Sequence, residues 1–262
     1  MVEERVRPER EKLLSKHYPT AQRRGTYWWQ YAGDSKGLYR AIETLDRVLV
    51  MPRVGKTVTP AFVESDQVFS DAVVVFAYDD WFHHGVLSSG FHYRWVVRHA
   101  SSLRTDTRYT PTDVFETFPQ PSFSCDIAEV AETLDGHRRQ LMLGEQIGLT
   151  SLYNRVHDPA ECSGAVRELR EWHAELDRAV RDAYGWDDLS LDHGFHDVRG
   201  AGPRFTFAPE AADEILVRLL ELNQERYLTE KQAGMHERKH PRRRPARPGS
   251  PARLFDDESE NP

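Results

Sequence analysis

The side chains best suited to reading a base sequence alternate along one short segment, as Arg104, Asp106 and Arg108. Residues two apart in an extended strand project from the same face, so these three would form one row. An arginine can bond O6 and N7 of guanine, and a carboxylate can accept a hydrogen bond from N4 of cytosine. The spacing therefore predicts a surface that contacts G·C pairs, although a charged strand at the edge of a sheet would show the same pattern.

Seven further side chains with cationic or hydrogen-bonding groups precede this row: Arg53, Lys56, Ser88, Ser89, His92, Arg94 and Arg98. The first two occupy a polar loop between predicted strands, where they would contact phosphates without reading bases. The other five lie on or near a predicted helix, and they are also compatible with an ordinary polar helix face. We expect all seven to contact nucleic acid.

An acid–histidine cluster, Asp79, Asp80, His83 and His84, offers a second kind of chemistry. Such side chains can hold a metal ion, as in a metal-dependent nuclease. Their spacing matches no established zinc motif, and adjacent histidines point to different faces of a helix. A carboxylate that caps a helix, followed by ordinary helical residues, is the favoured interpretation.

Apolar periodicity divides the rest of the chain into short strands and longer helices. Strands are predicted at 47–52, 61–63, 72–78 and 204–207, and helices at 37–45, 79–98, 126–146, 164–184 and 209–227. The helix at 79–98 is expected to be interrupted at Gly85 or Gly90. Arg23, Arg24 and Gly25 are expected to break the chain before an aromatic cluster at 27–31 that forms a strand or an anchoring loop.

The pattern predicts the fold class α+β. A charged lead at 1–26 precedes a small mixed α/β domain at 27–121, and a helical segment follows at 122–234. The final segment, 235–262, is rich in arginine and proline and then acidic, so it is predicted to be disordered.

Composition constrains the class of protein more weakly. The formal net charge of −7 argues against indiscriminate binding of polyanions, but a local basic patch is enough for a DNA reader. No apolar run is long enough to span a membrane, and the charged N-terminus is unlike a signal peptide. With only Cys125 and Cys162, the chain has no disulfide framework, and we expect it in the reducing cytoplasm.

A series of segments in order along residues 6–234 resembles the C-terminal part of the MmeI-like DNA adenine methyltransferases of single-chain restriction–modification systems. The matching segments are 6–10, 28–29, 38–42, 86–89, 115–121, 152–154, 176–180, 183–186 and 219–223, together with His92 and Trp95. The resemblance implies that 27–121 is a target-recognition domain, that 122–234 is its helical C-terminal segment, and that base-reading side chains lie around Arg104, Asp106 and Arg108.

The sequence lacks the motifs for the chemistry of that family. Adenine-N6 methylation requires a glycine-rich loop for S-adenosylmethionine and an Asn/Asp-Pro-Pro-aromatic loop for the flipped base, and neither occurs here. Our leading hypothesis is therefore a specificity module that binds double-stranded DNA, carries no cofactor of its own and acts with a catalytic methyltransferase domain or subunit that binds S-adenosylmethionine. The alternatives are a metal-dependent nuclease and a helical protein-interaction module.

Overall fold

The computed structural model describes residues 2–30, 35–103, 106–198 and 202–235. The chain divides into two compact units, residues 1–223 and 224–262, which are described separately. Its helices and strands are, in chain order, α1 (Val2–Glu11), the 3₁₀ helix η1 (Lys12–Ser15), α2 (Pro19–Thr26), α3 (Lys36–Ala41), β1 (Arg47–Pro52), β2 (Val54–Gly55), β3 (Ala61–Glu64), β4 (Val73–Phe76), α4 (Trp81–Ser88), α5 (Gly90–His99), β5 (Ser101–Leu103), β6 (Asp106–Arg108), α6 (Pro111–Val114), α7 (Cys125–Glu145), α8 (Leu149–Val156), α9 (Gly164–Ala183), β7 (Gly194–Val198), β8 (Gly202–Thr206) and α10 (Pro209–Gln232).

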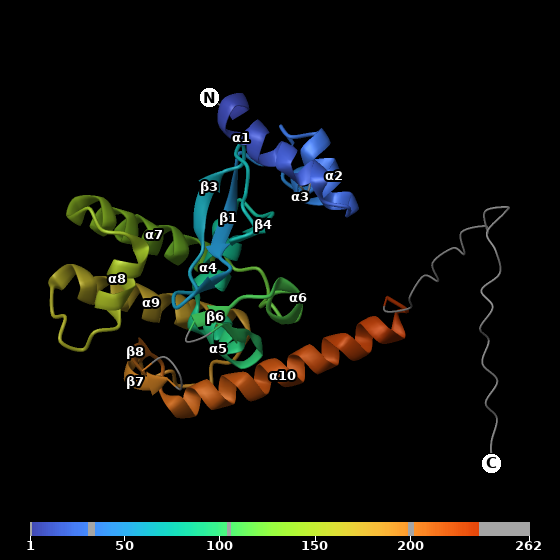
Figure 1. The fold of residues 1–262 in the computed structure, drawn as a ribbon. Coiled ribbons are helices and arrows are strands. Elements are labelled where there is room, and N and C mark those ends of the chain that lie inside the picture. Colours follow the sequence, from blue (N-terminus) through green and yellow to red (C-terminus); the bar gives the residue numbers. More distant parts are fainter. Residues whose placement is uncertain (1, 31–34, 104–105, 199–201, 236–262) are drawn as a thin grey trace, which may run out of the picture. The chain divides into compact units, whose positions relative to one another are not determined.

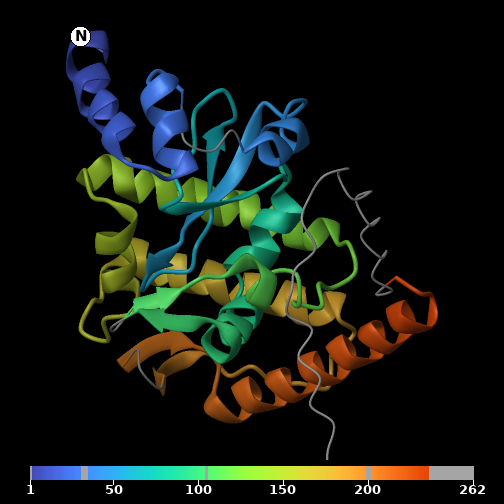
Figure 2. The same cartoon turned by 45° about the vertical axis from the view of Figure 1, so that its right-hand side comes forward.

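The first sheet is antiparallel, with the order β3-β1-β4 (Figure 1). In the central strand, Leu49 is opposite Phe62 of β3 and Phe76 of β4. β-Branched and aromatic residues favour strands. Within β1, the side chains of Leu49 and Met51 are buried. Helix α7 runs across one side of the sheet in Figure 2, and Arg138 of α7 donates a hydrogen bond to the carbonyl oxygen of Pro60, just before β3. The strands predicted at 47–52, 61–63 and 72–78 are confirmed, with β4 shorter than expected.

The second sheet, β2-β6-β5, is connected to the first through the backbone of Arg53. Its amide donates to the carbonyl oxygen of Ala72 at 2.8 Å, beside β4. Its own carbonyl oxygen accepts from the amide of Tyr109 at 2.8 Å, beyond the end of β6. One residue therefore fixes both sheets relative to each other.

The predicted helix at 79–98 is two helices, α4 and α5, each with a side-chain cap. The carboxylate of Asp80 accepts a hydrogen bond from the amide of His83 at 2.9 Å, which caps α4 as expected. The Ser89 hydroxyl accepts from the amide of His92 and caps α5. The interruption lies at Ser89, whose ψ of 156° is extended, so the helix breaks next to the predicted Gly90.

Two glycines in these helices allow close packing. A Cβ atom on Gly85 would lie 2.7 Å from a methyl group of Ile127, so glycine lets α4 approach α7. A Cβ atom on Gly90 would lie 2.6 Å from the ring of Phe207 and 2.8 Å from a carboxylate oxygen of Asp177. Both glycines thus hold the α4–α5 junction against the C-terminal half of the first unit.

One hydrophobic core extends through the first unit, from Leu49 in β1 to Leu219 in α10. It contains residues on both sides of position 121, including Trp95 of α5, Ile127 of α7 and Leu176 of α9, all buried. The expected α+β fold class is confirmed. The boundary predicted at residue 121 is not a break in the core, because α7 and α9 pack directly on the sheet-bearing part.

The N-terminal prediction was wrong in one respect. Arg23, Arg24 and Gly25 do not break the chain, because they lie inside α2. The aromatic cluster that follows forms a turn rather than a strand through residue 30, with Trp28 and Trp29 in edge-to-face contact. Residue 31, the last of that cluster, lies outside the described residues.

The second unit is described from Gln224 to Met235 and consists of the end of α10 and a turn, with exposed side chains. The segment predicted to be disordered lies outside the described residues, apart from Met235. Among the described residues, no helix is both long enough and apolar enough to cross a membrane.

Candidate nucleic-acid interface

The exposed face of the sheet β2-β6-β5 carries Arg108. Val54 of β2 and Ser101 of β5 lie directly opposite Arg108 in the register, so the three side chains share one face. All three are exposed, and Thr107, which projects to the other face, is half-buried. Of the predicted row, Arg104 lies outside the described residues, and the side chain of Asp106 is also outside what the structure describes.

Tyr109 anchors the strand that carries Arg108. Its side chain is buried, and its ring meets Phe76 of the first sheet edge-on at 6.0 Å between centroids. Its hydroxyl lies 3.0 Å from Nε2 of His92. Burial raises the pKa of the Tyr109 hydroxyl, which therefore remains protonated and donates this hydrogen bond. Arg108 is therefore followed directly by a residue whose side chain is held in the core.

His92 completes this anchor as a neutral imidazole. Its Nδ1 lies 3.0 Å from the carbonyl oxygen of Leu87, which can only accept, so Nδ1 carries the proton and Nε2 accepts from Tyr109. Burial lowers the pKa of His92 to about 4, with the hydrogen bond to Leu87 acting in the opposite direction. Both ring nitrogens of His92 therefore have a hydrogen-bond partner inside the fold.

Three of the predicted contacts are therefore corrected. Ser88, Ser89 and His92 are 8%, 1% and 0% exposed, so their side chains do not reach a duplex on the surface. The Ser89 hydroxyl caps α5 and also donates to the carbonyl oxygen of Val86 at 2.7 Å. The polar groups of Ser89 and His92 stabilise the interior of the fold, the Ser88 hydroxyl has no hydrogen-bond partner among the described residues, and none of the three side chains lies on the exposed face.

The four remaining cations have different surroundings. Lys56 follows β2 directly and is exposed, and Arg98 is exposed in the last turn of α5. Arg53 is half-buried, and its Nε donates to the carbonyl oxygen of Asp71 at 2.8 Å. Arg94 is bonded to the first turns of α10 through Ala212 and Asp213. Lys56 and Arg98 are thus the cations with the most accessible side chains.

The acid–histidine cluster is divided among separate contacts. Asp80 caps α4 and lies 2.7 Å from Nδ1 of His83, whose ring stacks on Tyr78. His84 points elsewhere: it is buried, stacks on Phe62 and contacts Arg138 of α7. Within the described part of the chain, no group of three or more His, Cys, Asp or Glu side chains is placed to hold a metal ion. The geometry does not favour the nuclease alternative at these residues.

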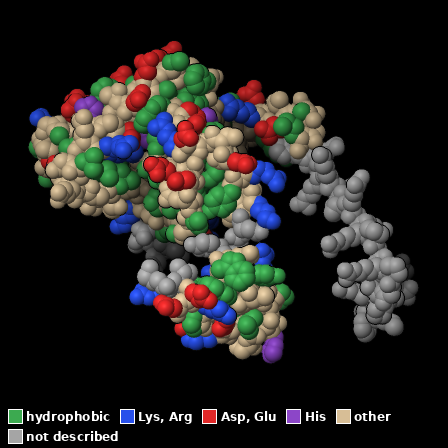
Figure 3. All heavy atoms as spheres, turned by 90° about the horizontal axis from the view of Figure 1, so that it is seen from above, with side chains coloured by type: hydrophobic (Ala, Val, Ile, Leu, Met, Phe, Trp, Pro, Cys, Tyr) green, Lys and Arg blue, Asp and Glu red, His purple; other side chains and the backbone are tan. Residues whose placement is uncertain are grey.

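Charged side chains of both signs are interspersed over the face of the molecule drawn in Figure 3. Because the formal net charge is also −7, the chain as a whole does not attract phosphates, and only local cations can do so. A phosphate-binding role therefore depends on individual residues such as Lys56 and Arg98.

A second group of polar residues was missed by the sequence analysis. His157, His173, His193 and Arg204 line one cavity with Asp177. No local motif indicates them, because His157 follows α8 and His173 lies within α9. Because these residues are far apart in the sequence, no local pattern indicates that they form a cluster.

Three comparisons with known proteins bear on this geometry. Residues 43–122 match the family model described as the MmeI target recognition domain. DNA methyltransferase A of Bacillus subtilis (strain 168) is 30% identical over 160 residues, which cover 57% of this chain and 17% of that protein. The solved structure of the type IIL restriction-modification enzyme MmeI in complex with DNA matches at 18% identity with a TM-score of 0.61, over 86% of this chain and 26% of that one. The chain therefore spans roughly a quarter or less of either relative.

Proposed function

We propose that this chain, which carries an MmeI-like target recognition domain at residues 43–122, reads the base sequence of double-stranded DNA for an adenine-N6 methyltransferase of a restriction–modification system. The match to the family model is the observation that carries the proposal. It includes the sheets β3-β1-β4 and β2-β6-β5 and the helices α4, α5 and α6, and therefore the exposed face around Arg108.

Each group on that face has a distinct proposed role. Arg108 is proposed to bond a base edge, because a guanidinium can make two hydrogen bonds to guanine. Asp106 and Arg104, in and just before the same strand, are proposed as its companions. Lys56 and Arg98 are proposed to contact phosphates, which positions the protein without reading sequence.

The chemistry is proposed to take place outside this chain. The sequence has neither a cofactor loop nor an adenine-binding loop, so S-adenosylmethionine would bind to a catalytic methyltransferase domain or subunit. The helices α7 and α9 share one core with the recognition domain. They would therefore transmit its orientation rigidly to that partner.

Selection from a pool of duplexes with randomised bases tests this function. We expect repeated capture by the full chain to enrich one short motif. A duplex with that motif should bind about a thousandfold or more tighter than unselected duplexes at the same salt concentration. A pool that stays unenriched, with binding that weakens equally for all sequences as salt rises, would overturn the proposal.

A further inference from the structure

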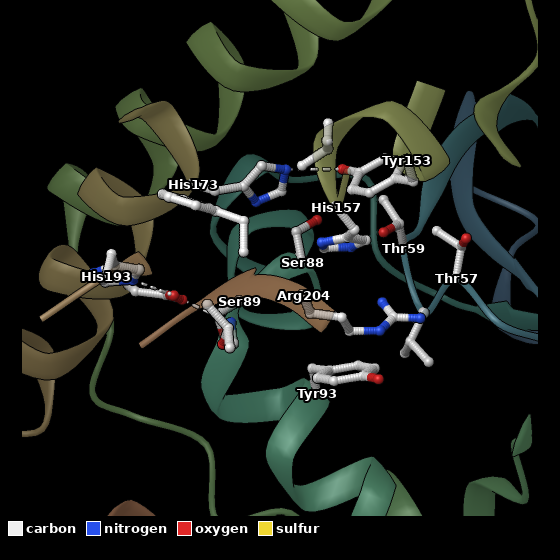
Figure 4. Close-up of a pocket in the computed structure, with 16 residues that line it drawn as sticks. Thr57, Thr59, Ser88, Ser89, Tyr93, Tyr153, His157, His173, His193 and Arg204 are labelled. Carbon is white, nitrogen blue, oxygen red and sulfur yellow. Dashed lines mark hydrogen bonds and ion pairs between the residues drawn. The ribbon is translucent and has the colours of Figure 1, made fainter. Parts of the chain in front are cut away.

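A cavity of about 70 Å³ lies between the recognition domain and the C-terminal helices of the first unit. Its walls come from segments distant in sequence: Thr57–Thr59 after β2, the α4–α5 junction, α8 with the residue that follows it, α9, and β8. In Figure 4 the side chains of Ser88, His157 and Arg204 come from three of these segments and point toward the same space.

Three buried polar atoms on these walls are unpaired. Oγ of Ser88, Nδ1 of His157 and Nε of Arg204 find no hydrogen-bond partner among the residues that the structure describes. Leaving a buried polar group without a hydrogen-bond partner destabilises the fold, so three such atoms on one cavity indicate a common partner. Ser88 is 8% exposed and has no other contact that explains its hydroxyl group.

Four further polar side chains of the cavity, Tyr153, His173, Asp177 and His193, have hydrogen-bond partners. The Tyr153 hydroxyl lies 3.0 Å from Nε2 of His173. The carboxylate of Asp177 accepts from the amide of Gly90 at 2.6 Å and lies 2.9 Å from Nε2 of His193. These pairs hold the walls of the cavity in place.

The unpaired atoms favour a ligand that accepts hydrogen bonds. Arg204 can only donate, and its guanidinium is held over the ring of Tyr93 and bonded to the carbonyl oxygen of Lys56. Burial, followed by the charge of Arg204, lowers the pKa of His157 to about 3, so this histidine is neutral and can donate. Arg204 therefore supplies a positive charge beside the unpaired atoms of Ser88 and His157.

Size and access restrict the ligand further. The cavity has less than half the volume of roughly 150 Å³ that accommodates a benzene ring. It opens toward a wider groove of about 410 Å³, which shares Thr57, Tyr153, His157 and Arg204 with it and adds Lys56 at its rim. A small oxyanion fits inside, while the rest of a larger molecule would occupy the groove.

We propose that this cavity binds a phosphoryl group through Ser88, His157 and Arg204, with Lys56 at its entrance. The oxygens of the group accept from the Ser88 hydroxyl, from Nδ1 of His157 and from Nε of Arg204. The ligand is either inorganic phosphate or the terminal phosphate of a small molecule or of DNA. This site shares Lys56 with the proposed DNA-binding face, but Ser88, His157 and Arg204 are not part of that face.

Isothermal titration of the full chain tests the site with three probes: inorganic phosphate, deoxyadenosine 5′-monophosphate and deoxyadenosine. We expect saturable binding of the first two and none of the third, which lacks the phosphate. Arg204→Gln should weaken phosphate binding about tenfold or more, and Ser88→Ala about fivefold, as for the loss of a charged and a neutral hydrogen bond. Ser88→Ala removes a hydroxyl group without a partner among the described residues, so its folding should be unaffected.

Matched changes at exposed residues away from the cavity, Arg139→Gln and Ser151→Ala, should leave phosphate binding unchanged. Displacement of bound phosphate by duplex DNA would assign the site to a DNA phosphate, and lack of displacement to a free phosphorylated molecule; both results support a phosphoryl site. Absence of saturable phosphate binding, or equal binding by wild type and folded Ser88→Ala, would overturn the inference whether or not the chain selects a DNA motif.

Discussion

Replacing Arg170 by methionine is expected to lower the free energy of unfolding by about 3–5 kcal/mol. Arg170 is 6% exposed, and its guanidinium donates to four backbone carbonyl oxygens, two at the C-terminal end of α8 and two in the segment that follows it. The acceptors are Val156, Glu161 and Asp158 at 2.8 Å and Arg155 at 3.0 Å. Methionine fills similar space but leaves these carbonyl groups without donors.

Urea denaturation measures this effect, with Arg167→Met as the control. Arg167 lies on the same helix and is exposed, so its replacement should change stability by less than about 0.5 kcal/mol. Arg170→Lys should recover only part of the loss, because an ammonium group cannot reproduce the planar fork. A loss below about 1 kcal/mol for Arg170→Met would show that the segment after α8 does not depend on these bonds.

Lowering the pH from 7 to 5 is expected to destabilise the chain, by about 2 kcal/mol through His92 alone. The pKa of His92 is lowered to about 4 in the fold, chiefly by burial, while an unfolded histidine titrates near its ordinary value. The unfolded state therefore takes up the proton first. The stability is fully present above the unfolded pKa and is lost as the pH falls toward the folded pKa.

His84 acts in the same direction, because burial and then the charge of Arg138 lower its pKa well below the ordinary value. Denaturation at pH 7, 6 and 5 gives the slope of the unfolding free energy with pH. His92→Gln should be less stable at pH 7 but should reduce this slope by close to one proton, whereas His17→Gln, at an exposed position, should not. Equal slopes in His92→Gln and wild type would contradict the neutral buried state of His92.

The fold was predictable where its signals are local. The β-branched and aromatic residues at 72–78 identified β4, and the helical period of 126–146 and 164–184 identified α7 and α9. Asp80 was recognised as a cap because its bond to the amide of His83 spans three residues. Such features depend on near neighbours in the chain, which the sequence displays directly.

The site was harder to predict because its partners are distant. His92 has a polar side chain among other polar residues, and nothing nearby in the sequence indicates that Tyr109, seventeen residues later, donates a hydrogen bond to it inside the core. Ser88 and Ser89 were misassigned for the same reason. The cavity brings Arg204 of β8 to His157, next to α8, and no spacing rule connects the two.

Comparing Arg108→Ala with Lys56→Ala across every single-base variant of the selected duplex tests directly whether this face reads bases. We expect Arg108→Ala to lose about 1–3 kcal/mol of discrimination at one base pair and to leave the preference at the other positions unchanged. Lys56→Ala should weaken binding to all duplexes alike and reduce its salt dependence. A uniform loss of affinity for Arg108→Ala, with the preference at every position intact, would contradict the assignment of this face to base reading.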